Sequence, residues 1–398
     1  MDVDKKKVML IIPNLGMGGA QRSFIKLANW LAEIYQVTVV VFDKAFENLY
    51  PLHADIRYLG EVSQSSLMGK AINFWKRIKS LNRLKKNLNP SVCISFLEGA
   101  DYLNMLTGSK VKRIISIRGS KRYDPHIKGL WGIVRKKILI PYFYKKADAI
   151  VTVSKGLEFE IRNDFPSLAG KLTTIPNGFQ LKPVQAVNTD SPFFILTWAG
   201  RFGDEKGLKE LIQIFVSCYR ENPSFRLMLL GDGAYRAKLL KQLEVNKIKT
   251  LVTDTMTTSL FEHNTVIFCN PGSAYEQYLS MGDVFVLTSP SEGFPNVIIE
   301  AMQQGLPVIS TDCKWGPREV LEPSLKYNIK ISYPYFGEFG VLLPLPLNEA
   351  AINVWKTILL EFQLDRSKLQ RYREKNEDAC MPFEQNKIKQ NWVNLIGK

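Results

Sequence analysis

Short runs of aliphatic and β-branched residues alternate with longer amphipathic stretches along the chain, and this alternation constrains the fold most strongly. Alternation of strands and helices predicts a parallel, doubly wound sheet, because each crossover helix returns the chain to start another parallel strand. The expected strands of the first half are 8–12, 37–42, 91–95, 113–117 and 149–153, and the expected helices are 20–34, 67–86, 131–146 and 155–164.

The same pattern begins again near residue 193. Between residues 175 and 192, turn residues and three prolines interrupt the periodicity, so we expect an interdomain linker there. Beyond it we expect strands at 193–198, 226–230, 266–269, 284–288 and 307–311, and helices at 207–219, 235–243 and 296–304. A chain of 398 residues is long enough for two domains.

The expected fold class is therefore α/β, with two facing Rossmann-like domains of doubly wound parallel sheet. The first domain spans 1–183 and the second 184–375, and a C-terminal helix in 376–398 packs back on the first domain. Ligands of such sheets bind beyond the carboxyl ends of the strands, so the expected site is an interdomain cleft.

Composition and motifs argue against several function classes. Five scattered cysteines without a C-x-x-C pair suggest neither a zinc site nor a disulfide framework, and they fit a reducing compartment. The three histidines have no spacing that would make a metal site. Pro13 and Asn14 end the first apolar run, which we interpret as a strand rather than a signal peptide. Serine-hydrolase and Walker motifs are absent from the sequence.

A glycine-rich loop, PNLGMGGA, follows the first expected strand. Gly18 and Gly19 let the backbone approach a ligand, and the helix expected from residue 20 offers free N–H groups to a phosphate. The loop lacks the G-x-G-x-x-G spacing. A turn made only for tight packing fits these residues equally well.

A second loop, GRFGDEKG, follows the first strand of the second half. At the carboxyl end of a core strand, the forked guanidinium of Arg201 and the ammonium of Lys206 could together neutralise a diphosphate. Two solvated surface cations are the alternative interpretation.

The third loop, SPSEGFPNVIIEAM, places Glu292 before an expected helix and Glu300 within it, because Pro295 suits the first turn. Backbone amides at the helix start would seat an anion, and the two carboxylates would accept hydrogen bonds from hydroxyl groups. A sugar joined to a phosphate presents that combination of groups. A surface acid and an acid favoured by the helix dipole are the alternative.

At these loops the chain resembles the family 4 glycosyltransferases, which are retaining enzymes of the GT-B fold. GRFGDEKG looks like the G-R-x…K-G loop of the family, and SEGFPNVIIEAMQQGLPVISTDCKWGPREVL looks like its E-x7-E segment with the following strand and G-P-R-E turn. PNLGMGGAQRSFIKLA resembles the G-G-A-E-R opening, with Gln21 in place of Glu. VSKGLEFEI, TTIPNGF and LLGDGAYR are similar to further family segments, so the motifs extend from residue 13 to about 320.

The resemblance implies roles for individual residues. Arg201 and Lys206 would hold the donor diphosphate and stabilise its charge, so no metal and no other cofactor is expected. Glu292 would hydrogen-bond the transferred sugar, and Glu300 the ribose of the nucleotide. The remaining donor contacts would come from Gly18 and Gly19 in the first domain and from the main chain of Gly293, Phe294, Asn296 and Val297.

One position departs from the family pattern. Many members carry a histidine after the strand that reads RIISI here, whereas this chain has Arg118, Gly119 and Ser120. Arg118 is similar to an E-R-[SN] variant without its Glu, so Arg118 and Ser120 are the acceptor-side candidates. His126, beyond Pro125, is interpreted as an exposed loop residue rather than a replacement base.

The formal charge of +15 is concentrated in one segment. Residues 70–146 hold 19 Lys and Arg residues but only three acids, and the rest of the chain is close to neutral. The basic residues alternate with aromatic residues such as Trp75 and Trp131, a pattern typical of helices in a membrane interface. Helices with apolar residues facing the core and Lys facing solvent are the alternative. Motifs that read nucleic acid are absent from the sequence, so no nucleic-acid partner is expected.

The expected function is transfer of a sugar from a nucleotide-diphosphate sugar to a lipid-linked saccharide in bacterial surface polysaccharide or glycan synthesis. Among such donors, a UDP-linked sugar is the one we expect. The expected location is the cytoplasm, at the inner face of the cell membrane and attached to its anionic surface. The alternatives within the fold are a nucleotide-sugar epimerase and a transferase with a soluble acceptor. A basic lipid- or nucleic-acid-binding protein with a degenerate enzyme core is the alternative from another class.

Overall fold

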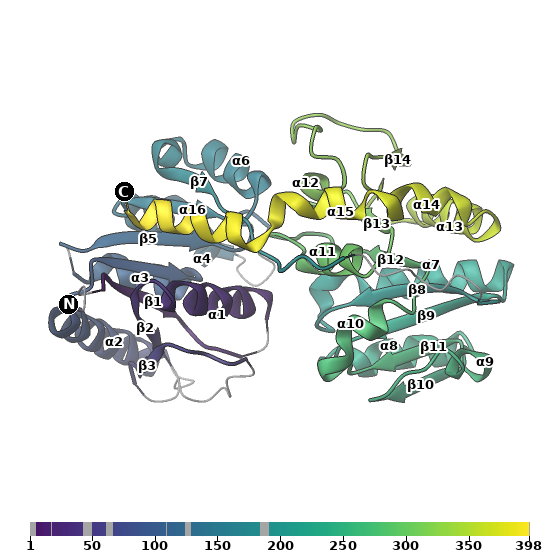
Figure 1. The fold of residues 1–398 in the computed structure, drawn as a ribbon, viewed down its shortest axis with the longest axis horizontal. Coiled ribbons are helices and arrows are strands. Elements are labelled where there is room, and N and C mark those ends of the chain that lie inside the picture. The colour runs from purple at the N-terminus through teal and green to yellow at the C-terminus, as the bar shows by residue number, and fades with distance from the viewer. Residues whose placement is uncertain are drawn as a thin grey trace. The chain divides into compact units, whose positions relative to one another are not determined.

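The computed structural model describes residues 5–16, 18–42, 50–60, 67–108, 110–123, 129–183 and 191–397. The chain divides into two compact units (Figure 1): Met1–Gly178 with Gln385–Lys398, and Phe179–Glu384. Both are built on a sheet of predominantly parallel strands, as the alternation in the sequence predicts. His126 and residues 184–190 of the expected linker lie outside the described part of the chain.

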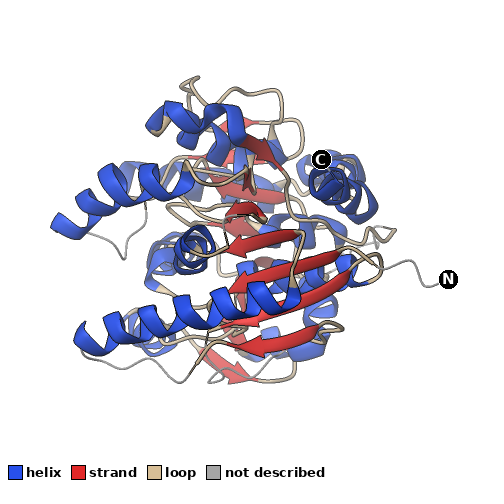
Figure 2. Cartoon of the chain, turned by 90° about the vertical axis from the view of Figure 1, so that its left-hand side faces the viewer, coloured by secondary structure: helices blue, strands red, loops and turns tan. Residues whose placement is uncertain are grey.

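The first unit has a seven-stranded parallel sheet in the order β3-β2-β1-β4-β5-β6-β7, and helices cover both of its faces (Figure 2). Its strands are β1 (Lys7–Ile12), β2 (Gln36–Val41), β3 (Asp55–Tyr58), β4 (Val92–Phe96), β5 (Lys112–Ile117), β6 (Ala149–Thr152) and β7 (Leu172–Thr174). Its helices are α1 (Gly19–Ala32), α2 (Leu67–Leu88), α3 (Glu98–Leu106), α4 (Gly129–Val134), α5 (Ile140–Tyr144), α6 (Lys155–Asp164) and α16 (Gln385–Gly397), with a 3-10 turn at Pro166–Lys171.

The inner strands are apolar on both faces because helices cover both, which makes them recognisable in the sequence. In β4 every residue is buried, and in β1 all but the first. The edge strand β3 is largely exposed and has a mixed sequence, which explains why the apolar pattern does not predict it.

The single helix expected at 131–146 is wrong in detail. Residues Arg135–Leu139 form a π-helical turn between α4 and α5. Pro141 lies in the first turn of α5 and lacks the N–H that a continuous α-helical ladder requires. The Arg135 side chain is buried, whereas its neighbours Lys137 and Ile138 are exposed.

The second unit has an eight-stranded sheet in the order β10-β11-β9-β8-β12-β13-β15-β14, parallel except for β14. Its strands are β8 (Phe194–Ala199), β9 (Phe225–Leu230), β10 (Thr250–Thr253), β11 (Val266–Cys269), β12 (Val284–Leu287), β13 (Val308–Thr311), β14 (Tyr335–Phe336) and β15 (Val341–Leu343). Its helices are α7 (Leu208–Glu221), α8 (Arg236–Val245), α9 (Leu260–His263), α10 (Tyr275–Leu279), α11 (Asn296–Gln303), α12 (Pro317–Leu321), α13 (Glu349–Leu364), α14 (Ser367–Glu374) and α15 (Asn376–Cys380), with 3-10 turns at Asp204–Lys206, Gly272–Ala274 and Met381–Phe383.

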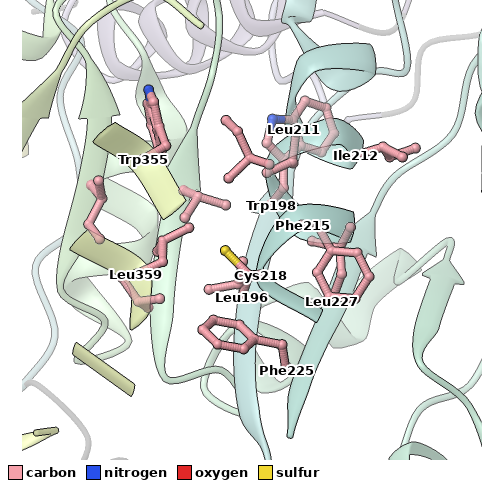
Figure 3. Packing of buried hydrophobic residues seen from close by; sticks show 14 of the residues in the cluster. Leu196, Trp198, Leu211, Ile212, Phe215, Cys218, Phe225, Leu227, Trp355 and Leu359 are labelled. Carbon is pink, nitrogen blue, oxygen red and sulfur yellow. The ribbon is translucent and has the colours of Figure 1, made fainter. Parts of the chain in front are cut away.

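A large apolar core joins β8 and β9 to helices α7 and α13 (Figure 3). Trp198, Phe215 and Trp355 are fully buried in it, and the indole of Trp355 donates a hydrogen bond to the carbonyl of Pro344 at 2.8 Å. This core holds β8 firmly, and with it the loop that follows β8.

The end of the chain is shared by the two units. Helix α15 packs against α11, and its Asn376 amide donates to the carbonyl of Leu306, so residues 376–384 belong to the second unit. Helix α16 packs against α1, and Ile388, Trp392 and Ile396 enter the core of the first unit. The prediction that 376–398 packs as a whole on the first domain is therefore wrong for residues 376–384.

A cluster of charged side chains is buried beneath α3 in the first unit. The Glu98 carboxylate accepts hydrogen bonds from Lys121 at 3.0 Å and from Arg135 at 2.6 Å. Burial alone would raise the pKa of Glu98, but Lys121, Arg135 and Tyr102 outweigh it and lower that pKa to about 2. Arg135 thereby ties the π-helical turn to α3.

Asp101, one turn further along α3, lacks a direct cationic partner in this cluster. Its carboxyl accepts hydrogen bonds from the Ser95 and Tyr144 hydroxyls, at 2.8 and 3.0 Å. Burial raises the pKa of Asp101 from 3.8 to about 7. An acid whose pKa rises on folding binds its proton more tightly in the folded chain, so its contribution to the free energy of unfolding falls as pH rises between these two values.

Replacing Asp101 with Asn should therefore make stability less dependent on pH between about 4 and 7. Above pH 7 the Asp101→Asn variant should melt higher than the wild type by on the order of 5 °C, and this advantage should vanish near pH 4. Thermal unfolding of both proteins from pH 4 to 9 measures the difference. A difference in melting temperature that stays constant with pH would contradict the buried, protonated Asp101.

Candidate functional site

The carboxyl ends of β8 and β12 are adjacent in the second sheet, where the strand order reverses direction. The loop after β8 closes on the end of β12 through Gly207, which has a φ of +66°. A Cβ on Gly207 would lie 2.1 Å from the carbonyl oxygen of Thr288, and the Thr288 hydroxyl donates to the Gly207 carbonyl at 2.9 Å. Only glycine permits this approach, which brings the second and third loops of the sequence together.

Lys206 and Glu292, predicted from separate loops, form an ion pair across this junction. The Lys206 Nζ lies 2.8 Å from the Glu292 Oε1, and both side chains are largely buried. Burial tends to lower the pKa of Lys206, but the Glu292 carboxylate more than offsets this, so the pKa of Lys206 is raised. Lys206 is therefore a fixed positive charge at neutral pH.

The main chain around Glu292 is also held in place. Its N–H donates to the carbonyl of Lys314 at 2.8 Å, and its carbonyl accepts from the N–H of Trp315 at 2.9 Å. These two bonds anchor the third loop to the segment after β13. The carboxylate of Glu292 is thus positioned from both its main chain and its side chain.

Arg201, the other predicted cation, is 61% exposed and pairs with Glu205 at 2.5 Å. The Glu205 carboxylate lies against Gly203, where an added Cβ would be 2.4 Å from Glu205 Oε2. Glu205 also acts electrostatically on Lys206. One carboxylate of the loop therefore lies close to both cations that the sequence assigns to a diphosphate.

Helix α11 begins at Asn296, directly after Pro295, and has no acidic residue in its first turn. The Phe294 ring is buried against Phe383, with ring centroids 5.1 Å apart. The main chain of the predicted residues Gly293, Phe294, Asn296 and Val297 therefore lies at the start of the helix, where N–H groups and the helix dipole favour an anion.

Glu300, about one turn into α11, accepts a hydrogen bond from the hydroxyl of Tyr275 at 2.9 Å. Tyr275 is the first residue of α10, which follows β11. Both side chains are half-buried. The contact links helices that follow two different strands.

Arg318 of the G-P-R-E turn is a structural residue here. Its guanidinium forms two 2.6 Å hydrogen bonds to the Asp312 carboxylate and donates to the carbonyls of Lys326 and Ile329. The Tyr333 hydroxyl joins the same carboxylate at 2.6 Å. These contacts hold the long loop before β14 against β13.

In the first unit, the glycine loop leads directly into α1. Gly18 is the N-cap residue of α1 and Gly19 its first residue. A Cβ on Gly18 would lie 2.3 Å from the Gln21 side chain, whose amide donates to Asn14 at 3.1 Å. Gln21, which replaces the Glu of the family motif, thus braces the loop internally.

Arg118 extends from the carboxyl end of β5. Its guanidinium donates to Asn177 at 2.8 Å and lies 4.0 Å from the Phe96 ring centroid. Burial lowers the pKa of Arg118 to about 9. Arg118, Lys26 and Asn177 line a cavity of about 10 Å³, which is room for one water.

Ser120, the second acceptor-side candidate, is used inside its own loop. Its hydroxyl donates to Glu160 at 2.6 Å and accepts from the N–H groups of Arg122 and Tyr123. The other Glu160 oxygen accepts from the N–H of Lys121. Ser120 therefore shapes the loop, and Arg118 is the candidate with a charge available at this edge.

Sequence reasoning missed Glu205, Tyr275 and Glu160. Glu205 is four residues after Arg201, and that spacing could have indicated a pair. Tyr275 and Glu160 contact residues 25 and 40 positions away, which no local pattern indicates. Within the described part of the chain, no three His, Cys, Asp or Glu side chains cluster as a metal site, and no helix is long and apolar enough to cross a membrane.

Two family models match successive parts of the chain. The model described as Glycosyltransferase Family 4 matches residues 17–182, and the model described as Glycosyl transferases group 1 matches residues 194–330.

Individual proteins are similar over most of the chain. An uncharacterized glycosyltransferase of Methanocaldococcus jannaschii is 28% identical over 76% of this chain and 78% of its own length. A Campylobacter jejuni protein, N-acetylgalactosamine-N,N'-diacetylbacillosaminyl-diphospho-undecaprenol 4-alpha-N-acetylgalactosaminyltransferase, is 24% identical over 96% of this chain and 97% of its own length.

The fold matches that of solved glycosyltransferase structures of the GT-B class. HepE of Anabaena, solved in complex with UDP and glucose, superposes with a TM-score of 0.73 at 16% identity, covering 99% of this chain and 100% of HepE. With two parallel-sheet α/β domains, a family model on each and the E-x7-E and K-G loops joined at one sheet edge, the chain is a glycosyltransferase of the family 4 type with the GT-B fold.

Proposed function

We propose that this enzyme transfers a sugar from a uridine-diphosphate sugar to a lipid-linked saccharide acceptor, with retention of configuration at the anomeric carbon. The observation that carries the donor half is the Lys206–Glu292 pair at the junction of β8 and β12. It sets a cation that suits a phosphate beside a carboxylate that can accept hydrogen bonds from sugar hydroxyls, and a nucleotide sugar presents both kinds of group. The UDP and glucose bound to HepE support the choice of nucleotide.

In this proposal, different residues bind different parts of the donor. Arg201 and Lys206 bind the diphosphate, the main chain at the start of α11 adds N–H donors, and Glu292 accepts hydrogen bonds from the sugar. As the bond between the anomeric carbon and the phosphate oxygen breaks, negative charge grows on the leaving diphosphate. Fixed cations stabilise that charge without needing to reorganise.

The acceptor hydroxyl forms the new bond to the anomeric carbon and gives its proton to the leaving phosphate oxygen. This step therefore requires no protein base. Since Arg201 and Lys206 neutralise the diphosphate, we propose that the enzyme requires no divalent metal, and transfer should persist in EDTA.

The acceptor half of the proposal rests on an exposed surface of the first unit, which we term the basic-apolar surface. Helices α2 and the α4–α5 segment contain no acidic residue. Trp75 and Trp131 are 63% and 75% exposed. The surface comprises the exposed apolar residues Met68, Ile72, Trp75, Leu130, Trp131, Ile133, Ile138 and Tyr142, with the exposed cations Lys76, Lys79, Arg83, Lys86, Lys137 and Lys145.

Helices α2 and α4 each follow a parallel strand, so both begin at the carboxyl edge of the first sheet, the edge that also carries Gly18 and Arg118. Met68 and Ile72 lie in the first two turns of α2, and Leu130, Trp131 and Ile133 lie in α4. Helix α3 contacts both α2 and α5. A membrane bound there would meet the edge that carries the acceptor-side residues. The lipid-linked acceptor in the name of the Campylobacter relative supports this assignment, and the inner face of the cell membrane is the proposed location.

Replacing Lys206 with Ala should reduce transfer at least about 10³-fold, because the variant loses charge stabilisation in the transition state. The Glu292→Gln variant should lose about 10²-fold. A radiolabelled-sugar transfer assay with lipid-linked acceptor measures both.

Thermal unfolding serves as the control for these two variants, because it separates a loss of the fold from a loss of transfer. Each substitution removes one charge of a largely buried pair, so we expect a lower melting temperature but a protein that is still folded at the assay temperature. Either variant with wild-type turnover and an unchanged melting temperature would contradict the site assignment.

Replacing Glu205 with Gln should tighten UDP binding about threefold at low salt. The carboxylate competes with the diphosphate for Arg201 and repels it near Lys206, and both effects disappear in the amide. Isothermal titration at two salt concentrations measures this, and the gain should shrink at high salt. Weaker binding by the Glu205→Gln variant would mean that Glu205 orients Arg201 rather than competing for it.

The wild-type protein should float with vesicles that contain anionic lipid and should dissociate at high salt. Replacing Lys79 and Arg83 with Glu should weaken binding at least about tenfold, since each basic residue near the surface contributes roughly 1 kcal/mol. Replacing Trp75 and Trp131 with Ser should also weaken it, by removing the apolar part of the interaction. A flotation assay measures each.

Leu364→Ser is the matched control for the flotation assay, because Leu364 is 80% exposed but lies at the end of α13 in the second unit. Equal vesicle binding by the wild type and the charge-reversed variant would contradict membrane attachment through this surface.

A further inference from the structure

Tyr275 forms a hydrogen bond in the second unit that the proposed function does not use. Its hydroxyl donates to Glu300 Oε2 at 2.9 Å, although Tyr275 follows β11 and Glu300 follows β12. Strands β9 and β8 lie between β11 and β12 in the sheet. The contact therefore spans the carboxyl edge of the sheet, beside the junction that holds Lys206 and Glu292.

Both ends of this contact are held by their own surroundings. The 3-10 turn Gly272–Ala274 leads directly into α10, so helical structure on both sides holds the main chain at Tyr275. Helix α11 packs against α15, where Cys380 Sγ lies 3.9 Å from the Ile299 carbonyl oxygen, and its residues Ile298, Ile299 and Met302 are buried. The hydrogen bond thus joins two positions that packing already fixes, and it adds little to the cost of ordering either side chain.

A carboxylate at the end of a flexible side chain recognises a diol well only if its orientation is fixed beforehand. The hydrogen bond from the Tyr275 hydroxyl to one oxygen of Glu300 restricts the torsion angles of the Glu300 side chain. A carboxylate held in this orientation can present its oxygens as acceptors to two adjacent hydroxyls. Because hydrogen bonds to charged groups are stronger than neutral ones, losing this orientation should cost measurable affinity.

We propose that Tyr275 is a positioning residue that orients Glu300 toward the ribose diol of the donor, so that the enzyme selects ribonucleotide over deoxyribonucleotide donors. This inference rests on the proposed function, since it assumes a nucleotide sugar in the second unit. The family resemblance already implies that Glu300 binds the ribose and Glu292 the sugar, so the inference concerns the role of Tyr275 alone.

The test compares the binding of UDP and of 2′-deoxy-UDP to the full chain by isothermal titration. The wild type should bind UDP about tenfold more tightly than 2′-deoxy-UDP. The Tyr275→Phe variant should lose about tenfold in UDP affinity and much less in 2′-deoxy-UDP affinity, so the ratio falls toward one. A merely structural role would weaken both nucleotides equally.

In the transfer assay, the Tyr275→Phe variant should raise KM for the donor while kcat stays near the wild-type value, because the sugar end is unchanged. The Glu300→Gln variant should lose the same discrimination, and the double variant should be no worse than Glu300→Gln alone. Tyr219→Phe is the matched control, since Tyr219 lies at the end of α7 and is stacked on Phe215.

Each outcome separates the two proposals. If the wild type binds no nucleoside diphosphate, the proposed function itself fails and this inference fails with it. If the wild type binds UDP without preferring it to 2′-deoxy-UDP, or if Tyr275→Phe keeps the wild-type preference or weakens both nucleotides equally, the role of Tyr275 is overturned while the proposed function stands.

Discussion

The candidate site at the carboxyl edge of the second sheet depends on the contact between Gly207 and the end of β12. Parallel strands buried on both faces leave little room for polar chemistry along their length, so charged groups gather in the loops at the carboxyl edge. Two such loops act together only if they touch. Here the absence of a side chain at Gly207 lets the β8 loop rest on Thr288, and this contact places Lys206 within 2.8 Å of Glu292.

The two cations at this edge are both paired, but with different consequences. The Arg201 side chain is exposed enough for water and salt to screen its pairing with Glu205, so this pair contributes little and exchanges easily for a diphosphate. Lys206 and Glu292 are more deeply buried and anchored by the main chain of the Lys314–Trp315 segment. Separating that pair would leave a buried charge uncompensated, so we expect it to persist when ligand is bound.

The sequence predicted the parts of the fold that depend on local patterns. Strands such as β1 and β4 were predictable because helices cover both their faces and make their sequences continuously apolar. The edge strand β3 and the π-helical turn at Arg135 were not, because exposure and a tertiary contact to Glu98 determine them. The division of the chain's end between two units was likewise invisible, since it depends on what α15 and α16 pack against.

At the candidate site, the sequence indicates the residues but not the residues that they contact. Motifs predicted Lys206, Glu292 and Glu300 as candidate site residues, since the spacing of glycines and acids is a local property. They could not find that Glu300 meets Tyr275, or that the Ser120 hydroxyl is directed to Glu160, since these partners are distant in sequence. The chemistry at a sheet edge is distributed over several loops, so its partners emerge only when the sheet is assembled.

The basic segment of the first unit illustrates how burial changes the meaning of a charge count. Of its 19 cations, Lys85, Lys121 and Arg135 are buried. Lys85 donates to the carbonyls of Asn104 and Thr107, and Lys121 and Arg135 share the carboxylate of Glu98. These cations stabilise the unit from within and attract nothing outside. Among the exposed cations of this basic segment that the structure describes, Lys110 and Arg122 lie elsewhere and the others lie on α2 and on the α4–α5 segment, beside exposed tryptophans. The basic-apolar surface is therefore smaller than the sequence suggests.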